Sequence, residues 1–568
     1  DIKLPVDGLK FRSNLGLDAR TVQDYEFWSA KTSNRGMGTS YAKNAVDKYT
    51  MFTLENMLFY DKTFNDKHTL GVTLLQSIQE DKRESVNVAM ENLPADNLKY
   101  YDLGSGLVTN TIGSSMIKWN MASFMGRINY NYLGRYLLTV SARYDGSSRL
   151  ADGHKWVLFP SAALAWRINE ESFMSSTSGW LDNLKLRLGF GKTGNSAVDP
   201  YQTKGTLSLI RYPFDNGGTP TIGYAPNAMA NSLLTWETTD QWNLGIDFGV
   251  LRGRINGTID LYMQNTHDLL LKRQLPVVSG FPDVLSNVGK TRNKGIEVSI
   301  NSMNINSKDF QWTTDLMLSS NKEEIVELYN GKNDDIGSKW FIGQPVNVHY
   351  DYRKVGIWQN TESDLAEMAK FAANGTEFAP GDIKIQDVNG DYKITDADKQ
   401  ILGNPRPKLI ASMVNTFNYK GFDLSVFLYA SFGAMLYNDI YAVEHCGRNG
   451  GVKVDYWTPN NPTNAYPRPS IDEERPIYIT STYYEKADFL RVKTMTLGYT
   501  LPKTLTNKFL VEKLRVYFTA QNPFIFTNYT GIDPEAAKVN SAGNPETNGS
   551  GFGTPSVSSW IFGINLTL

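Results

Sequence analysis

The stretch DVNGDYKITDAD, residues 387–398, carries the strongest local signal for chemistry in the sequence. Asp387, Asn389 and Asp391 stand at its first, third and fifth positions, and Asp398 stands at the twelfth. Ca²⁺ takes about 6–8 oxygen ligands, and an alternating run of this kind can wrap them round one ion. The predicted calcium ligands are Asp387, Asn389, Asp391, the backbone carbonyl of Lys393, and Asp398, with Thr395 contributing a hydroxyl or a bound water.

The loop departs from the EF-hand pattern, because Tyr392 stands where Gly is usual and Asp398 stands where Glu is usual. It is closer to the dockerin variant of such loops. A structural alternative is open: Thr395 would cap a short helix with Asp398 at its third position, and Gly403 would end it. Carboxylates this close repel one another without a cation, which favours calcium. We expect a structural calcium loop and a short helix within residues 381–403.

Other chemistry is poorly supported by the residue types. The five histidines are scattered, and His445 and Cys446, although adjacent, would point to opposite sides of an extended chain. The single cysteine excludes an internal disulfide framework and a cysteine-based zinc site. The net charge of −2 gives no electrostatic reason to expect a nucleic acid partner. We therefore predict that the protein is not an enzyme, with a surface hydrolase as a remote alternative.

The elements that must position this loop are β-strands. Apolar and polar residues alternate with a period of two along most of the chain, whereas a helical period is evident only in 363–373 and after the cation loop. Clear examples are 47–64, 136–145, 184–191, 255–264, 422–432, 514–521 and the terminal 560–568. We count roughly 16–17 such strands. Many exceed the about 9–11 residues that a tilted strand needs to cross a bilayer.

These strands favour a membrane barrel over soluble β-sandwiches or a propeller. Sandwich strands average about 5–6 residues, and the polar faces here carry charged residues in mid-strand, which suits a wet lumen. Tight turns at 133–135 and 251–253 alternate with long polar loops at about 196–232, 266–285, 360–406, 438–487 and 529–556. The fold class predicted is all-β, a transmembrane antiparallel β-barrel with its long loops on the extracellular side.

Aromatic and amide side chains are frequent in the long loops, as in 212–224, 339–358 and 455–470. Aromatic faces beside Asn and Asp suit stacking on sugar rings, and peptide is the next choice. Tyr-rich loops of this kind also occur in membrane barrels without any such role. The candidate substrate-contacting residues are Trp340, Tyr352 and Trp358.

An ordered series of motifs resembles the barrel of SusC/RagA-type TonB-dependent transporters. The most specific are DGSSR at 145–149 and FPS at 159–161 followed by AWRINEESF. Further matches follow in the family's order at 184–195, 234–251, 287–300, 381–408 and 489–502, and the closing strand WIFGINLTL completes them. The resemblance covers at least residues 120–568.

The resemblance implies a barrel of about 22 strands plugged by an N-terminal domain. We expect residues 1–568 to be the C-terminal part of that barrel, a single domain without the plug and the first strands. The location implied is the outer membrane of a Gram-negative bacterium. The function implied is active import of oligosaccharides; alternatives are peptide import by the same mechanism and a passive porin or adhesin barrel.

The partners implied are a SusD-like surface lipoprotein that closes over the mouth as a lid, and the TonB complex, which pulls on the N-terminal part. The remainder of the protein's own chain, outer-membrane lipid, and an oligosaccharide or peptide ligand complete the set. The family's motif at 381–408 contains the cation loop, and we expect that loop to hold the rim on which the lid docks.

Overall fold

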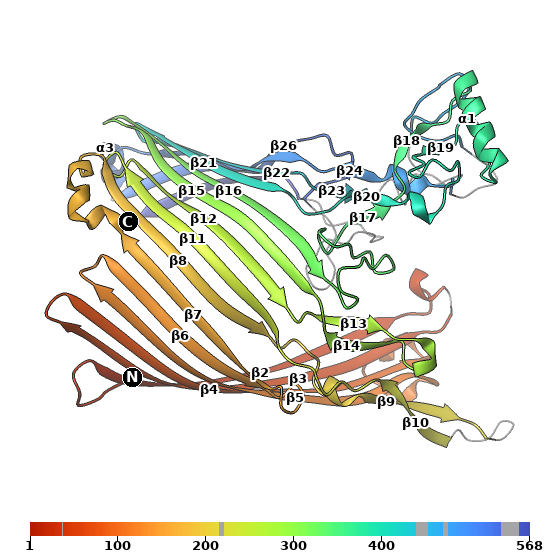
Figure 1. Cartoon of the computed structure of the whole chain (residues 1–568), viewed down its shortest axis with the longest axis horizontal. Coiled ribbons are helices and arrows are strands. Elements are labelled where there is room, and N and C mark those ends of the chain that lie inside the picture. The colour runs from red at the N-terminus through yellow and green to blue at the C-terminus, as the bar shows by residue number, and fades with distance from the viewer. Residues whose placement is uncertain are drawn as a thin grey trace. The chain divides into compact units, whose positions relative to one another are not determined.

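The computed structural model describes residues 1–36, 38–214, 221–438, 453–469, 475–509, 511–535 and 556–567. Two compact units are present: unit 1 comprises Asp1–Glu170, Leu186–Asn243 and Gln264–Lys290, and unit 2 comprises Glu171–Lys185, Leu244–Met263 and Thr291–Leu568. Seventeen strands belong to one large sheet (Figure 1). This confirms the predicted all-β class and the predicted number of strands, whereas the expectation of a single domain stays a prediction.

The strands of the large sheet are mostly long. They are β1 (Ile2–Lys3), β2 (Leu9–Trp28), β3 (Tyr41–Phe64), β4 (His68–Glu91), β5 (Val108–Tyr132), β6 (Tyr136–Ser147), β7 (Trp156–Arg167), β8 (Leu181–Asn195), β11 (Glu237–Val250), β12 (Ile255–His267), β15 (Lys290–Asn306), β16 (Phe310–Glu327), β21 (Leu409–Tyr419), β22 (Phe422–Phe432), β25 (Phe489–Thr500), β26 (Lys513–Thr527) and β27 (Ser559–Thr567).

Short elements occupy the segments between these strands. The short strands are β9 (Thr206–Tyr212), β10 (Thr221–Ala228), β13 (Leu270–Gln274), β14 (Asp283–Asn287), β17 (His349–Asp351), β18 (Lys354–Ile357), β19 (Ile383–Ile385), β20 (Gln400–Gly403), β23 (Met435–Tyr437) and β24 (Tyr484–Lys486). The α-helices are α1 (Glu362–Ala373) and α3 (Lys503–Thr506). Short 3₁₀ helices lie at Ser33–Arg35, Asp96–Leu98, Leu103–Ser105, Ile168–Glu170, Ser172–Thr177, Gln202–Lys204, Val277–Ser279, Asp396–Asp398 (η8), Ile479–Thr482 and Asn507–Phe509.

In unit 1, the strands from β1 to β7 form a meander in which each strand pairs antiparallel with the next. The predicted tight turn at 133–135 joins β5 to β6, and Leu133 (φ 56°) and Gly134 (φ 71°) both adopt left-handed backbone there. Because side chains alternate between the two faces of a strand, the register of the meander sorts its residues into one apolar and one polar face.

The apolar face of this meander is exposed and is bordered by two rows of aromatic rings. One row stacks Tyr136 against Tyr132 and Trp166, with ring centroids 6.2 and 6.4 Å apart. The other stacks Trp156 against Tyr144 and Phe124, at 5.0 and 6.3 Å. Tyr136 and Tyr144 are eight residues apart on β6, roughly 26 Å along the strand, or about 20 Å across a bilayer at the usual tilt. Exposed aliphatic side chains lie between the rows, among them Leu74, Ile128, Val140, Leu158 and Leu164.

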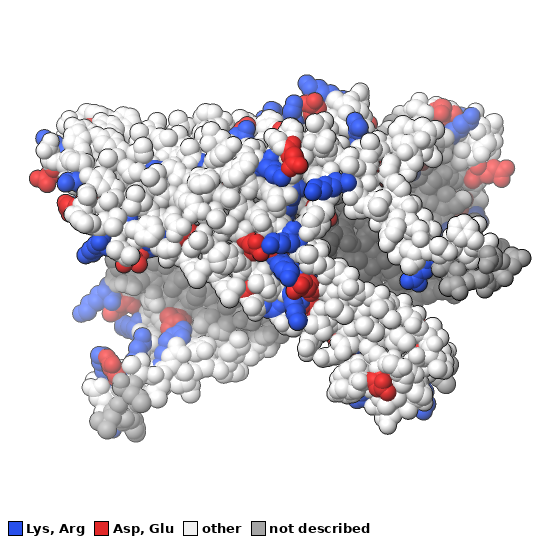
Figure 2. Space-filling model, turned by 90° about the horizontal axis from the view of Figure 1, so that it is seen from below, with Lys and Arg blue, Asp and Glu red and all other residues white. Residues whose placement is uncertain are grey.

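Beyond the second aromatic row, the same face becomes charged. The ion pairs Lys82–Glu84 and Lys118–Glu80 lie on β4 and β5, each with 2.8 Å between nitrogen and oxygen. Figure 2, seen from the side on which Figure 1 shows β2 to β5, displays a band of charged side chains beside an area with very few charges. An apolar belt with aromatic borders and charges beyond it is the surface of a membrane-spanning β-sheet.

In unit 2, β16, β21, β22, β25, β26 and β27 pair antiparallel in that order. The segments that connect these strands fold into a loop module, made of the sheets β17–β20 and β18–β19, helix α1, and segments 453–469 and 475–488 (Figure 1). Its core contains the buried side chains of Ile357, Ile383, Ile385, Trp457, Ile479 and Tyr483.

The loops differ from expectation in one respect. The segments 196–232 and 266–285, predicted as long polar loops, contain the hairpin β9–β10 and most of the hairpin β13–β14, whose second strand ends at Asn287. Their strands have only five to eight residues, so the alternation in them is too short to stand out from a Gly- and Asn-rich background. The helix predicted at 363–373 is confirmed as α1. Among the described residues, no helix is long and apolar enough to cross a membrane.

Candidate functional site

The predicted cation loop connects β19 to β20 at the surface of the loop module, and its carboxylates are hydrogen-bonded to the loop's own backbone. Asp387 accepts the N–H groups of Gly390 and Tyr392, at 2.7 and 2.8 Å. Asp391 accepts the N–H of Lys393 at 2.8 Å and an amide hydrogen of Asn389 at 3.0 Å. These bonds hold the three predicted ligands of the first half of the loop on a tightly wound turn.

The backbone of the loop has the conformation that a calcium loop needs at its sixth position. Gly is usual there because the turn is sharp, and in this chain Tyr392 adopts left-handed backbone with φ of 56°. Gly390, two residues earlier, is also left-handed, with φ of 74°. A positive φ is costly for a tyrosine. Packing offsets this cost, since the Tyr392 ring contacts the buried ring of Phe371 at 5.5 Å.

Asp398 closes the loop and is fully buried. Its Oδ1 accepts the N–H of Val388 at 2.9 Å, and its Oδ2 accepts the N–H of Thr395 at 2.8 Å. The structural alternative is therefore realised in part: Thr395 and Asp398 form a capping box on η8. The predicted end of that helix at Gly403 is wrong. The helix stops at Asp398, and Gly403 is the last residue of β20.

The fit of this loop to calcium is incomplete in the conformation described. No three His, Cys, Asp or Glu side chains in the described part of the chain are grouped so that they could hold a metal ion together. The backbone amides take the place of a cation as partners of Asp387, Asp391 and Asp398. Each carboxylate oxygen keeps a second lone pair, so the residues present could still bind an ion after a small rearrangement, and calcium stays a prediction.

Trp358, predicted to contact substrate, lies in the core of the loop module. Its side chain has no exposed surface and packs against Phe371 and Phe378, with ring centroids at 5.8 and 5.5 Å. The ammonium group of Lys384 lies 4.0 Å from the ring centroid. The assignment of Trp358 to a substrate surface is therefore corrected: the ring organises the module, and a ligand cannot reach it in this conformation.

Tyr352 and Trp340 are half-buried, and the prediction that they contact substrate stays open for both. The Tyr352 hydroxyl donates to Asp396 at 3.3 Å, and its ring meets that of Tyr478 edge-on at 5.0 Å. Burial and the neighbouring Asp396 raise the pKa of Tyr352 to about 12. Trp340 is held by backbone hydrogen bonds to Asp335 in both directions, at 2.8 and 2.9 Å.

Beside Tyr352, the loop module opens into a cleft of about 590 Å³, which we call the tyrosine cleft. Its lining combines aromatic faces with charges of both signs. It includes Tyr350, Tyr437 and Tyr484, Asp351 and Asp396, and Lys339 and Lys399. The stretch 339–358, marked in the sequence by its aromatic residues, supplies Lys339, Tyr350 and Asp351. The rest of the lining carries no such signal, because it comes from separate segments that only the fold of the module brings together.

Hydrogen bonds fix the polar groups of the tyrosine cleft. The Tyr484 hydroxyl donates to Asp351 at 3.1 Å, and burial together with this carboxylate raises the pKa of Tyr484. Asp396 pairs with Lys399 at 2.7 Å, and this hydrogen bond lowers the pKa of Asp396. The Asp396 carboxylate is therefore ionised at neutral pH. The cleft can accept hydroxyl or amide hydrogens from a ligand and can present ring faces to it.

His445 and Cys446 lie outside the described residues, as do parts of the predicted loops at 212–224, 438–487 and 529–556.

Comparison with known proteins places residues 6–522 in the family model described as "TonB dependent receptor-like, beta-barrel". Among curated proteins, the chain is 32% identical over 581 residues to TonB-dependent receptor P3 of Formosa agariphila, across 99% of this chain and 56% of that protein. It is 35% identical over 434 residues to TonB-dependent receptor SusC of Bacteroides thetaiotaomicron, across 73% of this chain and 41% of that protein. The chain thus spans about half the length of the curated relatives it matches.

Among solved structures, the RagAB peptide transporter matches 99% of this chain and 60% of its own, with a TM-score of 0.81 and 22% sequence identity. The same importer in its "open-open" state matches with a TM-score of 0.82. At this level of identity the likeness concerns the fold.

Proposed function

Because the chain belongs to the TonB-dependent receptor-like β-barrel family, we propose that it imports oligosaccharides across the outer membrane of a Gram-negative bacterium. The family consists of outer-membrane transporters and not of enzymes, so the surface hydrolase considered above is set aside. Import itself needs no covalent chemistry on the substrate. The chain must supply a binding surface at its extracellular end and a polar path through the membrane.

The observation that carries the choice of oligosaccharide is the tyrosine cleft. Its volume of about 590 Å³ lies within the range of about 300–1,000 Å³ that small-molecule sites occupy. Sugar rings present an apolar face and a rim of hydroxyl groups, which match ring faces such as that of Tyr350 and ionised acceptors such as Asp396. The half-buried Tyr352 hydroxyl, already bonded to Asp396, extends the same surface.

Binding to the whole protein in detergent tests this proposal. Isothermal titration with a panel of neutral oligosaccharides is expected to give binding that Tyr350→Ala or Asp396→Asn weakens at least about tenfold, which corresponds to loss of one charge-assisted hydrogen bond or one stacking contact. Asp309→Asn is the matched control, because Asp309 is an exposed carboxylate in the turn between β15 and β16. An unchanged affinity in both cleft variants would place the binding site elsewhere.

Peptide is the second candidate, since the RagAB peptide transporter shares this fold. Charges of both signs in the cleft, Lys339 and Lys399 beside Asp351 and Asp396, would suit the ends of a short peptide. A mixture of tryptic peptides titrated in parallel decides between the two. Binding of peptides without binding of any oligosaccharide would identify peptide as the substrate, and the proposed transport function would be unaffected.

We further propose that a SusD-like lipoprotein covers the extracellular end and that TonB supplies the energy. The support is the family itself, with SusC among the relatives. Purification of the whole protein from its own outer membrane is expected to bring down a lipoprotein in equal amount. Uptake of labelled substrate is expected to stop when TonB is deleted. If the protein were a passive porin or an adhesin, deletion of TonB would leave the measured uptake unchanged.

Calcium binding by the loop at 387–398 is a separate proposal. The left-handed Tyr392 and the ordered spacing of Asp387, Asn389 and Asp391 support it. Chelation is expected to expose 387–398 to faster hydrogen exchange, and re-addition of Ca²⁺ alone is expected to reverse this. Asp391→Asn should lower the Ca²⁺ affinity, while Asp334→Asn, a loop carboxylate outside the module's cation loop, should not. Equal rates of hydrogen exchange with and without chelator would contradict calcium binding, and the capping box alone would then account for the order of the loop.

A further inference from the structure

Three polar side chains interrupt the apolar face of unit 1 level with its second aromatic row, since Gln76 pairs with Phe124, which pairs with Tyr144. Ser13, Asn56 and Gln76 stand opposite one another on β2, β3 and β4, since the register pairs Ser13 with Asn56 and Asn56 with Gln76. Along its own strand, each is flanked by apolar residues of the same face: Phe11 and Leu15, Leu54 and Leu58, Leu74 and Ile78. Polar residues on a lipid-facing surface are costly, and in membrane proteins they usually have a partner or a role.

Hydrogen bonds run through these side chains in one direction. The Ser13 hydroxyl donates to the Asn56 carbonyl oxygen at 2.8 Å, and the Asn56 amide nitrogen donates to the Gln76 carbonyl oxygen at 2.8 Å. The series ends on the Gln76 amide nitrogen, which finds no acceptor within the described part of the chain. Hydrocarbon offers such a group no acceptor, so the partners within its reach at the lipid surface are water and the polar groups of lipids.

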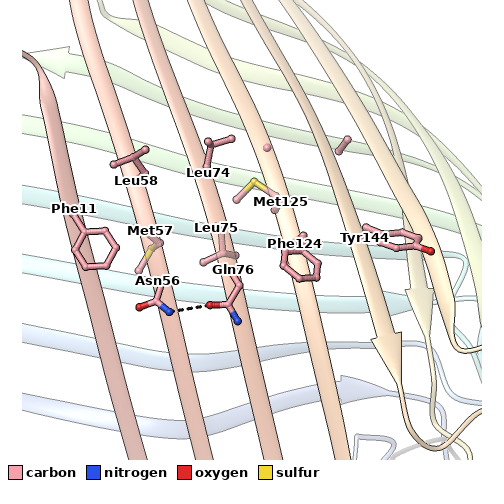
Figure 3. Close-up of a pocket in the computed structure, with 12 residues that line it drawn as sticks. Phe11, Asn56, Met57, Leu58, Leu74, Leu75, Gln76, Phe124, Met125 and Tyr144 are labelled. Atoms are coloured by element: carbon pink, nitrogen blue, oxygen red, sulfur yellow. Dashed lines mark hydrogen bonds between the residues drawn. The ribbon is translucent and has the colours of Figure 1, made fainter. Parts of the chain in front are cut away.

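A groove of about 540 Å³ lies beside this amide (Figure 3). Its walls are the side chains of Phe11, Leu58, Leu74, Phe124 and Tyr144, and Asn56 and Gln76 form its polar edge. The space exists because Gly126 and Ala142, opposite each other on β5 and β6, are small. A Cβ built on Gly126 would meet only Leu74 Cδ2 within 4 Å, at 3.7 Å, so the space above Gly126 is open.

The depth of Gln76 follows from the charges further along β4. Glu80, which pairs with Lys118, is four residues beyond Gln76, about 13 Å along the strand and about 10 Å along the membrane normal. Headgroup layers are about 5–8 Å thick. Gln76 therefore lies near the border between headgroups and hydrocarbon, where the ester groups of lipids are found.

We propose that this groove binds one acyl chain of a membrane lipid, whose ester carbonyl accepts a hydrogen bond from the Gln76 amide nitrogen. The lining contains no charged residue, so it suits the uncharged ester and chain and gives a phosphate no partner. A second copy of the protein is the competing occupant, and the Ala142→Leu variant below distinguishes it from lipid. The site is distinct from the tyrosine cleft and does not depend on what the protein imports.

Native mass spectrometry of the detergent-purified protein tests this. The probes are a diacyl phosphatidylethanolamine and its dialkyl ether analogue, which has the same chains and headgroup but no ester carbonyl. We expect one diacyl lipid to be retained at least about fivefold more than the ether lipid, the ratio that one hydrogen bond gives. Equal retention of both lipids would overturn the hydrogen bond.

Two variants separate the amide from the groove. Gln76→Leu is expected to abolish the preference for the ester lipid, and Ala142→Leu, which fills the groove, to abolish retention of either lipid. Ala162→Leu, on β7 of the same face and outside the groove, is the matched control and should retain lipid as the original protein does. Heat-dependent migration in detergent gels verifies that each variant is folded. Unchanged retention in Ala142→Leu, or a dimer that Ala142→Leu disrupts, would overturn the proposal.

Discussion

At the scale of the residue, His349 links the loop module to pH. Its ring is buried, and its Nε2 donates to the Met435 carbonyl at 2.8 Å, while Nδ1 has no partner in the described part of the chain. Burial lowers the pKa of His349 below its usual value of 6.5. The ring is therefore neutral in the folded module at pH values at which it would already be charged in the unfolded chain.

The sign of the effect follows from proton binding. Below pH 6.5 the unfolded chain binds a proton at this residue that the folded module does not, so the module loses stability as the pH falls. We expect segment 349–403 to become more sensitive to protease between pH 7.5 and pH 5.5. His349→Gln, which can keep the bond to Met435, should remove that component. A pH response of the same size in the variant would assign it to other groups.

Arg491 is a second residue whose substitution is expected to lower the stability of the protein markedly. It is buried on β25 and pairs with the buried Asp533 at 2.5 Å and with Glu535 at 3.0 Å. Arg491→Met would leave the buried Asp533 without its cation, which typically costs about 3–5 kcal/mol, whereas Glu535 would keep its ion pair with Lys493. We expect a clear loss in the free energy of unfolding in urea.

A more exposed pair supplies the comparison for Arg491. Arg515 pairs with Asp423 at the same distance of 2.5 Å, but both side chains keep part of their surface in solvent. Arg515→Met should therefore cost less than Arg491→Met, because water can solvate the remaining carboxylate. Equal losses in the two variants would show that burial does not decide the effect.

At the scale of the element, α1 (Glu362–Ala373) depends on the N-cap residue that precedes it. Thr361 caps the helix by accepting the N–H of Asp364 at 3.2 Å, and Met368 and Phe371 bury the opposite side of α1 against Trp358. Thr361→Ala removes the cap, and the usual cost of about 1 kcal/mol corresponds to about fivefold faster hydrogen exchange across 362–373. Thr361→Ser keeps the hydroxyl and should exchange like the original chain.

The elements also show what the sequence could predict and what it could not. Strands such as β22 are found at the expected residues, 422–432. They could be predicted because apolar and polar residues alternate along a segment long enough to cross the membrane. The exposure of a loop aromatic has no such local signal. Trp358 and Tyr350 both look like surface residues in the sequence, yet one is a core residue and the other lines a cleft, because packing between distant segments decides. The cation loop could be predicted in part: local residues determine its turns, but they do not determine whether an ion is bound there.

At the scale of the whole molecule, the two faces of the sheet should respond differently to charge. Leu164 is exposed on the apolar face of β7, whereas its neighbour Ala163 is on the polar face. An arginine on the lipid side of a barrel costs about 2–4 kcal/mol near the midplane and less toward the interface, and Leu164 lies two residues inside the aromatic row at Tyr136 and Trp166. Leu164→Arg is therefore expected to lower the yield of folding into lipid vesicles, and Ala163→Arg to leave it nearly unchanged. The reverse order would exchange the assignment of the two faces.

The meander of unit 1 has a consequence for how this chain is assembled. From β2 to β7 each strand pairs with its neighbour in the sequence, across connections of three to sixteen residues. Closing such short loops costs little chain entropy, and the cost grows only slowly with length. Each completed strand therefore offers a template for the next one. Insertion can proceed as a series of hairpin additions, and the rate of assembly should depend on the slowest hairpin more than on the total number of strands.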